Sequence, residues 1–175
     1  MGQLINGEWI QGSVSNNSKD GGFKRLNSVF RNNISEDHNT YVAESNRYHL
    51  YVSYACPWAH RTLIFRKLKN LEDYISVDFS HPDMLEMGWS FARDFPNATG
   101  DTLYDKKYAH EIYQLSDKKI STKATVPILW DKKSCSIVNN ESSEIVRIMN
   151  SAFNNPVSYT HLRAHETLRY LVCRL

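Results

Sequence analysis

Cysteine is scarce in this chain of 175 residues, which contains only Cys56, Cys135 and Cys173. An odd number of widely spaced cysteines excludes a disulfide framework and is typical of a reducing compartment, so we expect a cytoplasmic protein. Long hydrophobic runs are also missing, because no segment approaches the roughly 18 apolar residues of a membrane span. The N-terminus has neither the basic head nor the apolar stretch of a secretory signal. We therefore expect no membrane partner.

An excess of charge of one sign is missing as well. The chain holds 21 lysine and arginine residues against 19 aspartate and glutamate residues, a net charge of +2. This balance excludes a strongly basic surface as the means of holding nucleic acid, so we expect no nucleic-acid partner. Hydrophobic residues make up 41% of the chain and charged residues 23%, which is typical of one globular domain. The last twenty residues hold three arginines and one glutamate, so the composition changes near Pro156.

Hydrophobic periodicity predicts the order strand, helix, strand, helix, strand, strand, helix. The strands are expected at residues 48–54, 75–79, 124–131 and 135–138, and the helices after Pro57, over 104–115 and from about Asn140 onwards. The first crossover is a βαβ unit, which implies parallel strands and a right-handed connection. The last two strands are joined by a tight turn at 132–134 and so form an antiparallel hairpin. This order predicts an α/β fold of the thioredoxin-like kind, βαβ plus ββα.

The same patterns assign faces and ends to the helices. In the first helix, the polar side is expected to carry Arg61, Arg66, Lys67 and Lys69. In the second, one apolar stripe is expected to carry Tyr108, Ile112 and Leu115. The third helix is expected to be capped by Asn140 or Ser142, with a carboxylate in or near its first turn.

Residues 1–46 are polar and interrupted by loop signals. Isolated apolar side chains are expected to pin this arm onto a domain, namely Trp9, Phe23, Phe30 and Ile34. We therefore predict an N-terminal extension over residues 1–46 that packs on a domain formed by residues 47–155.

The sharpest candidate for chemistry is Cys56, in the segment Cys56-Pro57-Trp58-Ala59. Pro57 suits a first helical turn, which places Cys56 at the N-cap, where free N–H groups and the helix dipole favour the nucleophilic thiolate. Ala59 leaves no second thiol in the motif, which disfavours a dithiol cycle and favours a single thiol that uses an external one. Cys56 and His60 have a metal-binding spacing, but no further ligand pair accompanies them, so we expect no metal. A buried structural cysteine is the alternative.

Three further segments are candidates for binding. Pro127 enters a strand and is a candidate for a cis peptide bond that frees backbone groups of Val126 for an extended peptide; a trans edge proline is the alternative. Glu141 and Ser142 open the last helix and either hold the charged ends of an amino acid or form a plain cap. Trp89 lies in a polar excursion, where it is either a ligand platform or a plug on the core.

Several motifs, in their order and spacing, resemble one family. They are RYHLYVS (47–53), ACPWAHRTL (55–63), GW (88–89), FP (95–96), GDTLY (100–104), TVPILWD (125–131) and NES (140–142). Over residues 1–155 the chain resembles the glutathionyl-hydroquinone reductases, which are the Xi-class glutathione transferases. The resemblance implies a thioredoxin-like N-terminal domain, glutathione as co-substrate and glutathionyl-hydroquinones as partners. For the full-length family it also implies a homodimer.

The resemblance further implies roles for single residues. Glutathione would lie with its γ-glutamyl end at Glu141 and Ser142, its backbone along Val126, and Trp89 over it. Cys56 would attack the glutathionyl sulfur, the hydroquinone would leave, and a second glutathione would resolve the mixed disulfide.

The chain also departs from the family. Lys123 stands where the family has an arginine that contacts glutathione, and lysine keeps the charge but loses the bidentate fork. We expect the all-helical C-terminal domain of the family to be missing, which would expose Ile64 and Leu68 and impair activity. Residues 156–175 do not resemble the family and are expected to be a non-native tail, with a short amphipathic helix as the alternative. A glutaredoxin-like monothiol transferase and a non-catalytic glutathione-binding module are the alternative functions.

Overall fold

The computed structural model describes residues 2–12, 27–35 and 38–154. The expected anchor Phe23, the third cysteine Cys173 and the expected tail at 156–175 lie outside the described residues. Within the described part of the chain, no helix is both long and apolar enough to cross a membrane.

A mixed sheet of four strands in the order β4-β3-β7-β8 forms the centre of the fold. Its strands are β3 (Tyr48–Val52), β4 (Ile75–Phe79), β7 (Ile128–Asp131) and β8 (Ser136–Asn139). Strand β3 pairs in parallel with β4 and antiparallel with β7, and β7 and β8 form an antiparallel hairpin. The predicted thioredoxin-like topology is confirmed.

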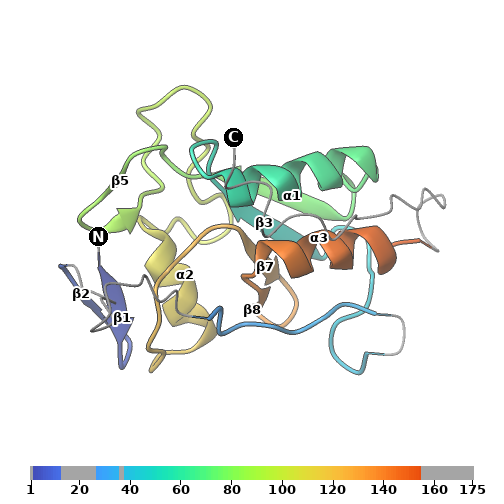
Figure 1. Ribbon diagram of the computed structural model, residues 1–175, viewed down its shortest axis with the longest axis horizontal. Coiled ribbons are helices and arrows are strands. Elements are labelled where there is room, and N and C mark those ends of the chain that lie inside the picture. Colours follow the sequence, from blue (N-terminus) through green and yellow to red (C-terminus); the bar gives the residue numbers. More distant parts are fainter. Residues whose placement is uncertain (1, 13–26, 36–37, 155–175) are drawn as a thin grey trace, which may run out of the picture.

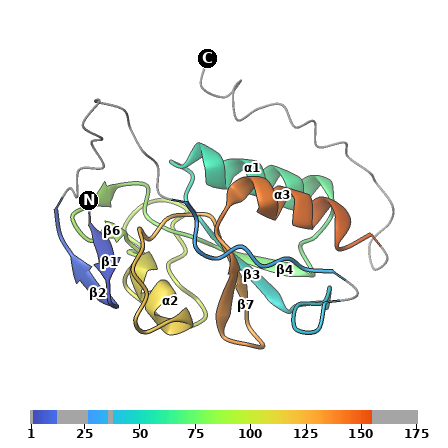
Figure 2. The same ribbon diagram turned by 60° about the horizontal axis from the view of Figure 1, so that its bottom comes forward.

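The sheet separates two layers of helices. Helices α1 (Pro57–Leu68) and α3 (Ser142–Ser151) lie side by side over one face, and α2 (Ala109–Ser116) covers the other (Figure 1 and Figure 2). Because successive strand residues point to opposite faces, Leu50 and Val52 join the apolar cluster beneath α1 and α3, whereas Tyr51 joins the cluster beneath α2. On the outer side of α1, Ile64 and Leu68 are 46% and 53% exposed, as expected.

The described N-terminal residues pack on the domain in two places. The hairpin of β1 (Gln3–Ile5) and β2 (Glu8–Ile10) lies against α2, where the Trp9 ring stacks on His110 with centroids 4.3 Å apart. Residues 28–34, which we call the N-terminal strap, run along β8. There the Asn32 N–H donates to the Val138 carbonyl at 3.0 Å, and the side chain of Ile34 is buried.

The second helix begins at Ala109 rather than near Tyr104, which corrects the prediction. The preceding residues wrap around a buried carboxylate instead of forming a first turn. Both oxygens of Asp101 take part, accepting the backbone N–H groups of Leu103, Tyr104 and Lys106 at 3.0 to 3.2 Å. These N–H groups are thereby satisfied without a helix.

The buried face of α2 also differs from the predicted stripe. Leu115 is exposed, whereas the buried residues are Ala109, His110, Ile112 and Tyr113. The buried face differs from the prediction because N-terminal residues pack over α2. Trp9 of β2 stacks on His110, and the ring of Phe30 packs edge-on to Tyr113.

Three smaller predictions need correction. Strand β7 begins at Ile128 rather than at residue 124, since Pro127 has no N–H to donate to a ladder. Cys135 lies in the hairpin turn with a φ of 50° rather than in a strand, so β8 begins at Ser136. Lys69 is buried rather than on the polar side of α1, because its ammonium group donates to a carbonyl of α3 at 3.2 Å.

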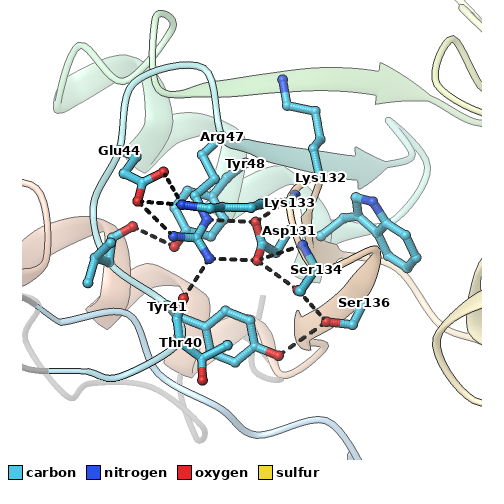
Figure 3. Close-up of polar contacts among 12 residues, drawn as sticks. Thr40, Tyr41, Glu44, Arg47, Tyr48, Asp131, Lys132, Lys133, Ser134 and Ser136 are labelled. Atoms are coloured by element: carbon cyan, nitrogen blue, oxygen red, sulfur yellow. Dashed lines mark hydrogen bonds and ion pairs between the residues drawn. The ribbon is translucent and has the colours of Figure 1, made fainter.

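A buried ion pair joins the start of β3 to the end of β7 (Figure 3). The Arg47 guanidinium donates to both oxygens of Asp131 at 2.8 Å, and the two side chains are 5% and 0% exposed. The same guanidinium donates to the Thr40 carbonyl at 2.6 Å and to Glu44 at 3.1 Å. Asp131 also accepts the Ser134 hydroxyl at 2.7 Å. One buried carboxylate thus fixes both the hairpin turn and the segment that leads into β3.

Candidate functional site

Cys56 is the N-cap of α1, as predicted. Its backbone is extended, with φ −101° and ψ 109°, and its carbonyl accepts the His60 N–H at 2.9 Å. The residue is 9% exposed, and its thiol lies 3.5 Å from the Val126 carbonyl oxygen. The helix start and the loop before β7 therefore bring the two predicted site residues into direct contact.

The loop before β7 is held from the side of α2. Val126 is buried, and the peptide bond between Val126 and Pro127 is cis. The residue before it, Thr125, is bonded through its backbone to the hydroxyl of Tyr113, which accepts the Thr125 N–H at 3.2 Å and donates to the Thr125 carbonyl at 2.9 Å.

The N-cap of α3 is Glu141, which corrects the prediction, because it lies one residue after Asn140 and one before Ser142, the two expected caps. Its carboxylate accepts the backbone N–H of Ser143 at 3.4 Å and the Ser143 hydroxyl at 3.1 Å. Its other oxygen accepts the hydroxyl of Ser28, in the N-terminal strap, at 3.1 Å. The first-turn carboxylate is Glu144, which pairs with Arg31. The strap thus contacts this helix start at two points.

Arg61 joins the two helix starts, although the sequence assigned it to the polar side of α1. Its guanidinium donates to the buried Ser142 hydroxyl at 2.6 Å and lies 4.0 Å from the Glu141 carboxylate. It also lies over the Trp58 ring, 5.0 Å from the centroid. The sequence could have indicated this role of Arg61, because the residue lies about one turn into the helix that begins at the candidate nucleophile Cys56. A positive charge therefore lies between α1 and the start of α3.

The remaining predicted residues lie on loops and short strands. Trp89 ends β6 (Gly88–Trp89), which forms a two-stranded hairpin with β5 (Met84–Leu85). Its ring is partly buried and packs against both apolar clusters, one of which contains Cys56 and Val126. Lys123 is partly buried in the loop that leads to Val126, and its carbonyl accepts the Thr122 hydroxyl at 3.4 Å.

Sequence reasoning missed the residues that hold this site from behind. Besides Arg61, they are Ser28, which donates to the Glu141 carboxylate, and Tyr113, which donates to the Thr125 carbonyl and accepts the side-chain amide of Asn140. In the part of the chain that the structure describes, no three His, Cys, Asp or Glu side chains gather closely enough to hold a metal ion.

A thioredoxin-like sheet with a cysteine at the start of the first helix is typical of thiol- and glutathione-dependent proteins, among them the N-terminal domains of glutathione transferases. The family model "Glutathione S-transferase, N-terminal domain" matches residues 55–152, more than half of the chain, and the chain belongs to this family.

Individual proteins match this chain over most of its length. Glutathionyl-hydroquinone reductase YqjG of Escherichia coli (strain K12) is 51% identical over 161 residues, which cover 88% of this chain and 49% of YqjG. Glutathionyl-hydroquinone reductase PcpF of Sphingobium chlorophenolicum is 42% identical over 155 residues, which cover 89% of this chain and 48% of PcpF. The glutathione-bound structure of YqjG from Escherichia coli K-12 matches with a TM-score of 0.74 at 48% identity, over 89% of this chain and 47% of that chain. The chain spans about half the length of these relatives.

Proposed function

We propose that this protein uses glutathione to reduce glutathionyl-hydroquinones to hydroquinones. The observation that carries the proposal is the Cys56 thiol at a helix N-cap, 3.5 Å from the Val126 carbonyl, in a chain 51% identical to a glutathionyl-hydroquinone reductase. The cysteine content favours a reducing compartment, so we place the reaction in the cytoplasm. We further infer a homodimer for the full-length protein, and a glutathione-binding domain at residues 47–155 supported by the extension at 1–46.

Each site residue has a chemical task in this proposal. Glu141 and Ser142 hold the ammonium and carboxylate ends of the γ-glutamyl group at the start of α3. The backbone of Val126 pairs with the extended tripeptide, which puts the glutathione sulfur next to Cys56. Trp89 covers the peptide, and Lys123 supplies one positive charge.

The reaction proceeds in two exchanges at sulfur. The Cys56 thiolate attacks the glutathionyl sulfur, so that an S–S bond forms while the bond between sulfur and the ring carbon breaks. The electron pair of the broken bond goes to the ring carbon, which takes up a proton and leaves as hydroquinone. The thiolate of a second glutathione then attacks the glutathione sulfur of the mixed disulfide. Cys56 is released as thiolate, and glutathione disulfide is the oxidised product.

The test is turnover of the full chain on two substrates, a glutathionyl-hydroquinone and a simple glutathione mixed disulfide. Release of hydroquinone with one glutathione disulfide formed per turnover supports the proposal. Turnover of the mixed disulfide alone would show a glutaredoxin-like transferase instead, and glutathione binding without any turnover would show a binding module.

Replacement of Glu141 by glutamine should weaken glutathione binding by roughly 1–3 kcal/mol, because the charged partner of the γ-glutamyl ammonium is lost. Calorimetric titration with glutathione measures this effect. Glu72→Gln is a matched control, since Glu72 also pairs with a cation, Lys67 at 2.7 Å, but lies beyond the other end of α1. Unaltered affinity in Glu141→Gln would remove Glu141 from the site.

A further inference from the structure

We propose that Tyr113 is a positioning residue for the glutathione site, because its hydroxyl fixes the Val126 loop and the Glu141 helix start relative to one another. The inference rests on the function proposed above and deepens it. Tyr113 lies on α2, on the face of the sheet opposite to Cys56 and α1, and its side chain is fully buried. It therefore acts on the site through other residues and does not touch glutathione.

The Tyr113 hydroxyl makes its first set of hydrogen bonds with the loop before β7. The Tyr113 hydroxyl accepts the Thr125 N–H at 3.2 Å and donates to the Thr125 carbonyl at 2.9 Å, so it satisfies both backbone groups of one residue. Thr125 directly precedes Val126, whose carbonyl lies against the Cys56 thiol. The orientation of the Val126 peptide groups is thus set by a hydroxyl on the far side of the sheet.

The same hydroxyl also holds the start of α3, through the side chain of Asn140. The side-chain amide of Asn140, the residue before Glu141, donates to the same hydroxyl at 3.0 Å. The Asn140 side-chain oxygen accepts the Phe30 N–H at 3.1 Å, so the amide is held at both ends. The strap that contains Phe30 also provides the Ser28 hydroxyl to the Glu141 carboxylate. Tyr113 therefore connects the helix start, the strap and the loop through one atom.

The hydroxyl is suited to this task because it keeps its proton. Burial raises the pKa of Tyr113 above its ordinary value, although hydrogen bonds to Thr125 and Asn140 act in the opposite direction. The hydroxyl then uses its single hydrogen for the Thr125 carbonyl and its lone pairs for two N–H donors. Removing it leaves three polar groups without that partner, which favours a shift of both segments.

The backbone of Cys56 depends on a different set of bonds, and only its thiol reaches the loop, 3.5 Å from the Val126 carbonyl oxygen. Its N-cap geometry rests on the His60 N–H and on the Ser53 carbonyl, which accepts the Cys56 N–H at 3.1 Å. Loss of the Tyr113 hydroxyl should therefore weaken glutathione binding while leaving the reactivity of the free thiol unchanged. A general loss of structure would change both, so the split between the two readouts identifies a positioning role.

The test compares Tyr113→Phe with Tyr48→Phe in the full chain. Tyr48 is the matched control, because it is also fully buried and its hydroxyl donates to the Val42 carbonyl at 2.6 Å, away from the site. Glutathione affinity is measured by calorimetry, and the rate of Cys56 alkylation is measured without glutathione. We expect Tyr113→Phe to raise the glutathione Kd about tenfold, the equivalent of one lost hydrogen bond of about 1.4 kcal/mol, with the alkylation rate within twofold of wild type. Tyr48→Phe should change neither by more than about twofold, although both variants lower the melting temperature.

A second variant keeps the proposal testable if Tyr113→Phe does not fold. Asn140→Asp preserves the shape and the acceptor for Phe30, but it removes the donor and draws the Tyr113 proton away from the Thr125 carbonyl. It should weaken glutathione binding by a similar factor.

The outcomes separate this inference from the proposed function. A wild-type chain that does not bind glutathione overturns both. A wild-type chain that binds, with Tyr113→Phe or Asn140→Asp binding equally well, overturns the positioning role alone. Equal weakening in Tyr48→Phe, or a parallel loss of thiol reactivity in Tyr113→Phe, would also overturn it by showing a general structural effect.

Discussion

Replacement of Cys56 by serine should lower the rate of glutathione transfer and of hydroquinone release by roughly a thousandfold or more, because the serine hydroxyl stays protonated where a thiolate is needed. The measurement is the intact mass of the protein after incubation with glutathione disulfide, together with the rate of hydroquinone release. Cys135→Ser is the matched control, since Cys135 is exposed in the turn between β7 and β8 and lies at no helix start. It should form the Cys56 adduct at the wild-type rate.

Alkylation gives a second readout for the same prediction. In alkylation of the free protein, Cys56→Ser should lose the fastest-reacting thiol of the chain, and Cys135→Ser should retain it. A Cys56→Ser protein that is alkylated as fast as wild type would show that the nucleophile lies elsewhere.

Replacement of Arg47 by methionine should lower the free energy of unfolding by about 3–5 kcal/mol, the usual cost of leaving one member of a buried ion pair without its partner. Asp131, which is 0% exposed, would lose two hydrogen bonds of 2.8 Å (Figure 3). Urea denaturation at pH 7 measures the loss. Lys67→Met, at an ion pair whose lysine is 80% exposed, is the control and should cost no more than about 1 kcal/mol.

The cost of Arg47→Met should also depend on pH. Burial alone would raise the pKa of Asp131, but hydrogen bonds from Arg47, Ser134 and the Lys133 backbone outweigh it and hold the pKa below the ordinary 3.8. A carboxyl whose pKa is lower in the folded state contributes stability above its unfolded-state pKa, and this stability is lost as the pH falls through the folded-state pKa. The difference between wild type and Arg47→Met should therefore be larger at pH 7 than at pH 3. An equal difference at pH 7 and pH 3 would contradict this account.

The double variant Arg47→Met with Asp131→Leu should recover much of the stability that Arg47→Met loses.

The sequence predicted the elements whose signals are local. The strand at Ile75–Phe79 was predicted to the residue, and the start of α1 followed from Cys56 and Pro57. The predicted start of α2 was wrong. The Asp101 carboxylate, which lies outside the helix, accepts the N–H groups that were expected to belong to the first turn of α2. A carboxylate that binds its own following backbone competes with a helix, and apolar periodicity contains no information on that competition.

The residues of the candidate site also divide into those with a local sequence signal and those whose role depends on partners distant in sequence. Cys56, Val126 and Glu141 belong to short motifs with a chemical reason for their position, and the structure places the first two in contact. Arg61 lies inside the motif at 55–63 and Tyr113 in no motif, but neither role could be predicted, because the partners are distant in sequence: Ser142 lies 81 residues from Arg61, and Asn140 lies 27 residues from Tyr113. Only the packing of α1 beside α3, and of α2 beneath the sheet, brings these groups together.

The N-terminal strap has a consequence for the order of events during synthesis. Its partners on α3 come much later in the chain, since Ser28 and Glu141 are 113 residues apart, as are Arg31 and Glu144. At a synthesis rate of about 5–20 residues per second, the strap waits roughly 5 to 20 seconds for these partners to emerge from the ribosome. Until then, the backbone groups of the strap that bond to β8, such as the Asn32 N–H, lack their partners, and an unpaired segment can pair with another chain. Slower translation after residue 35 would therefore prolong the time during which the strap can pair with a neighbouring chain.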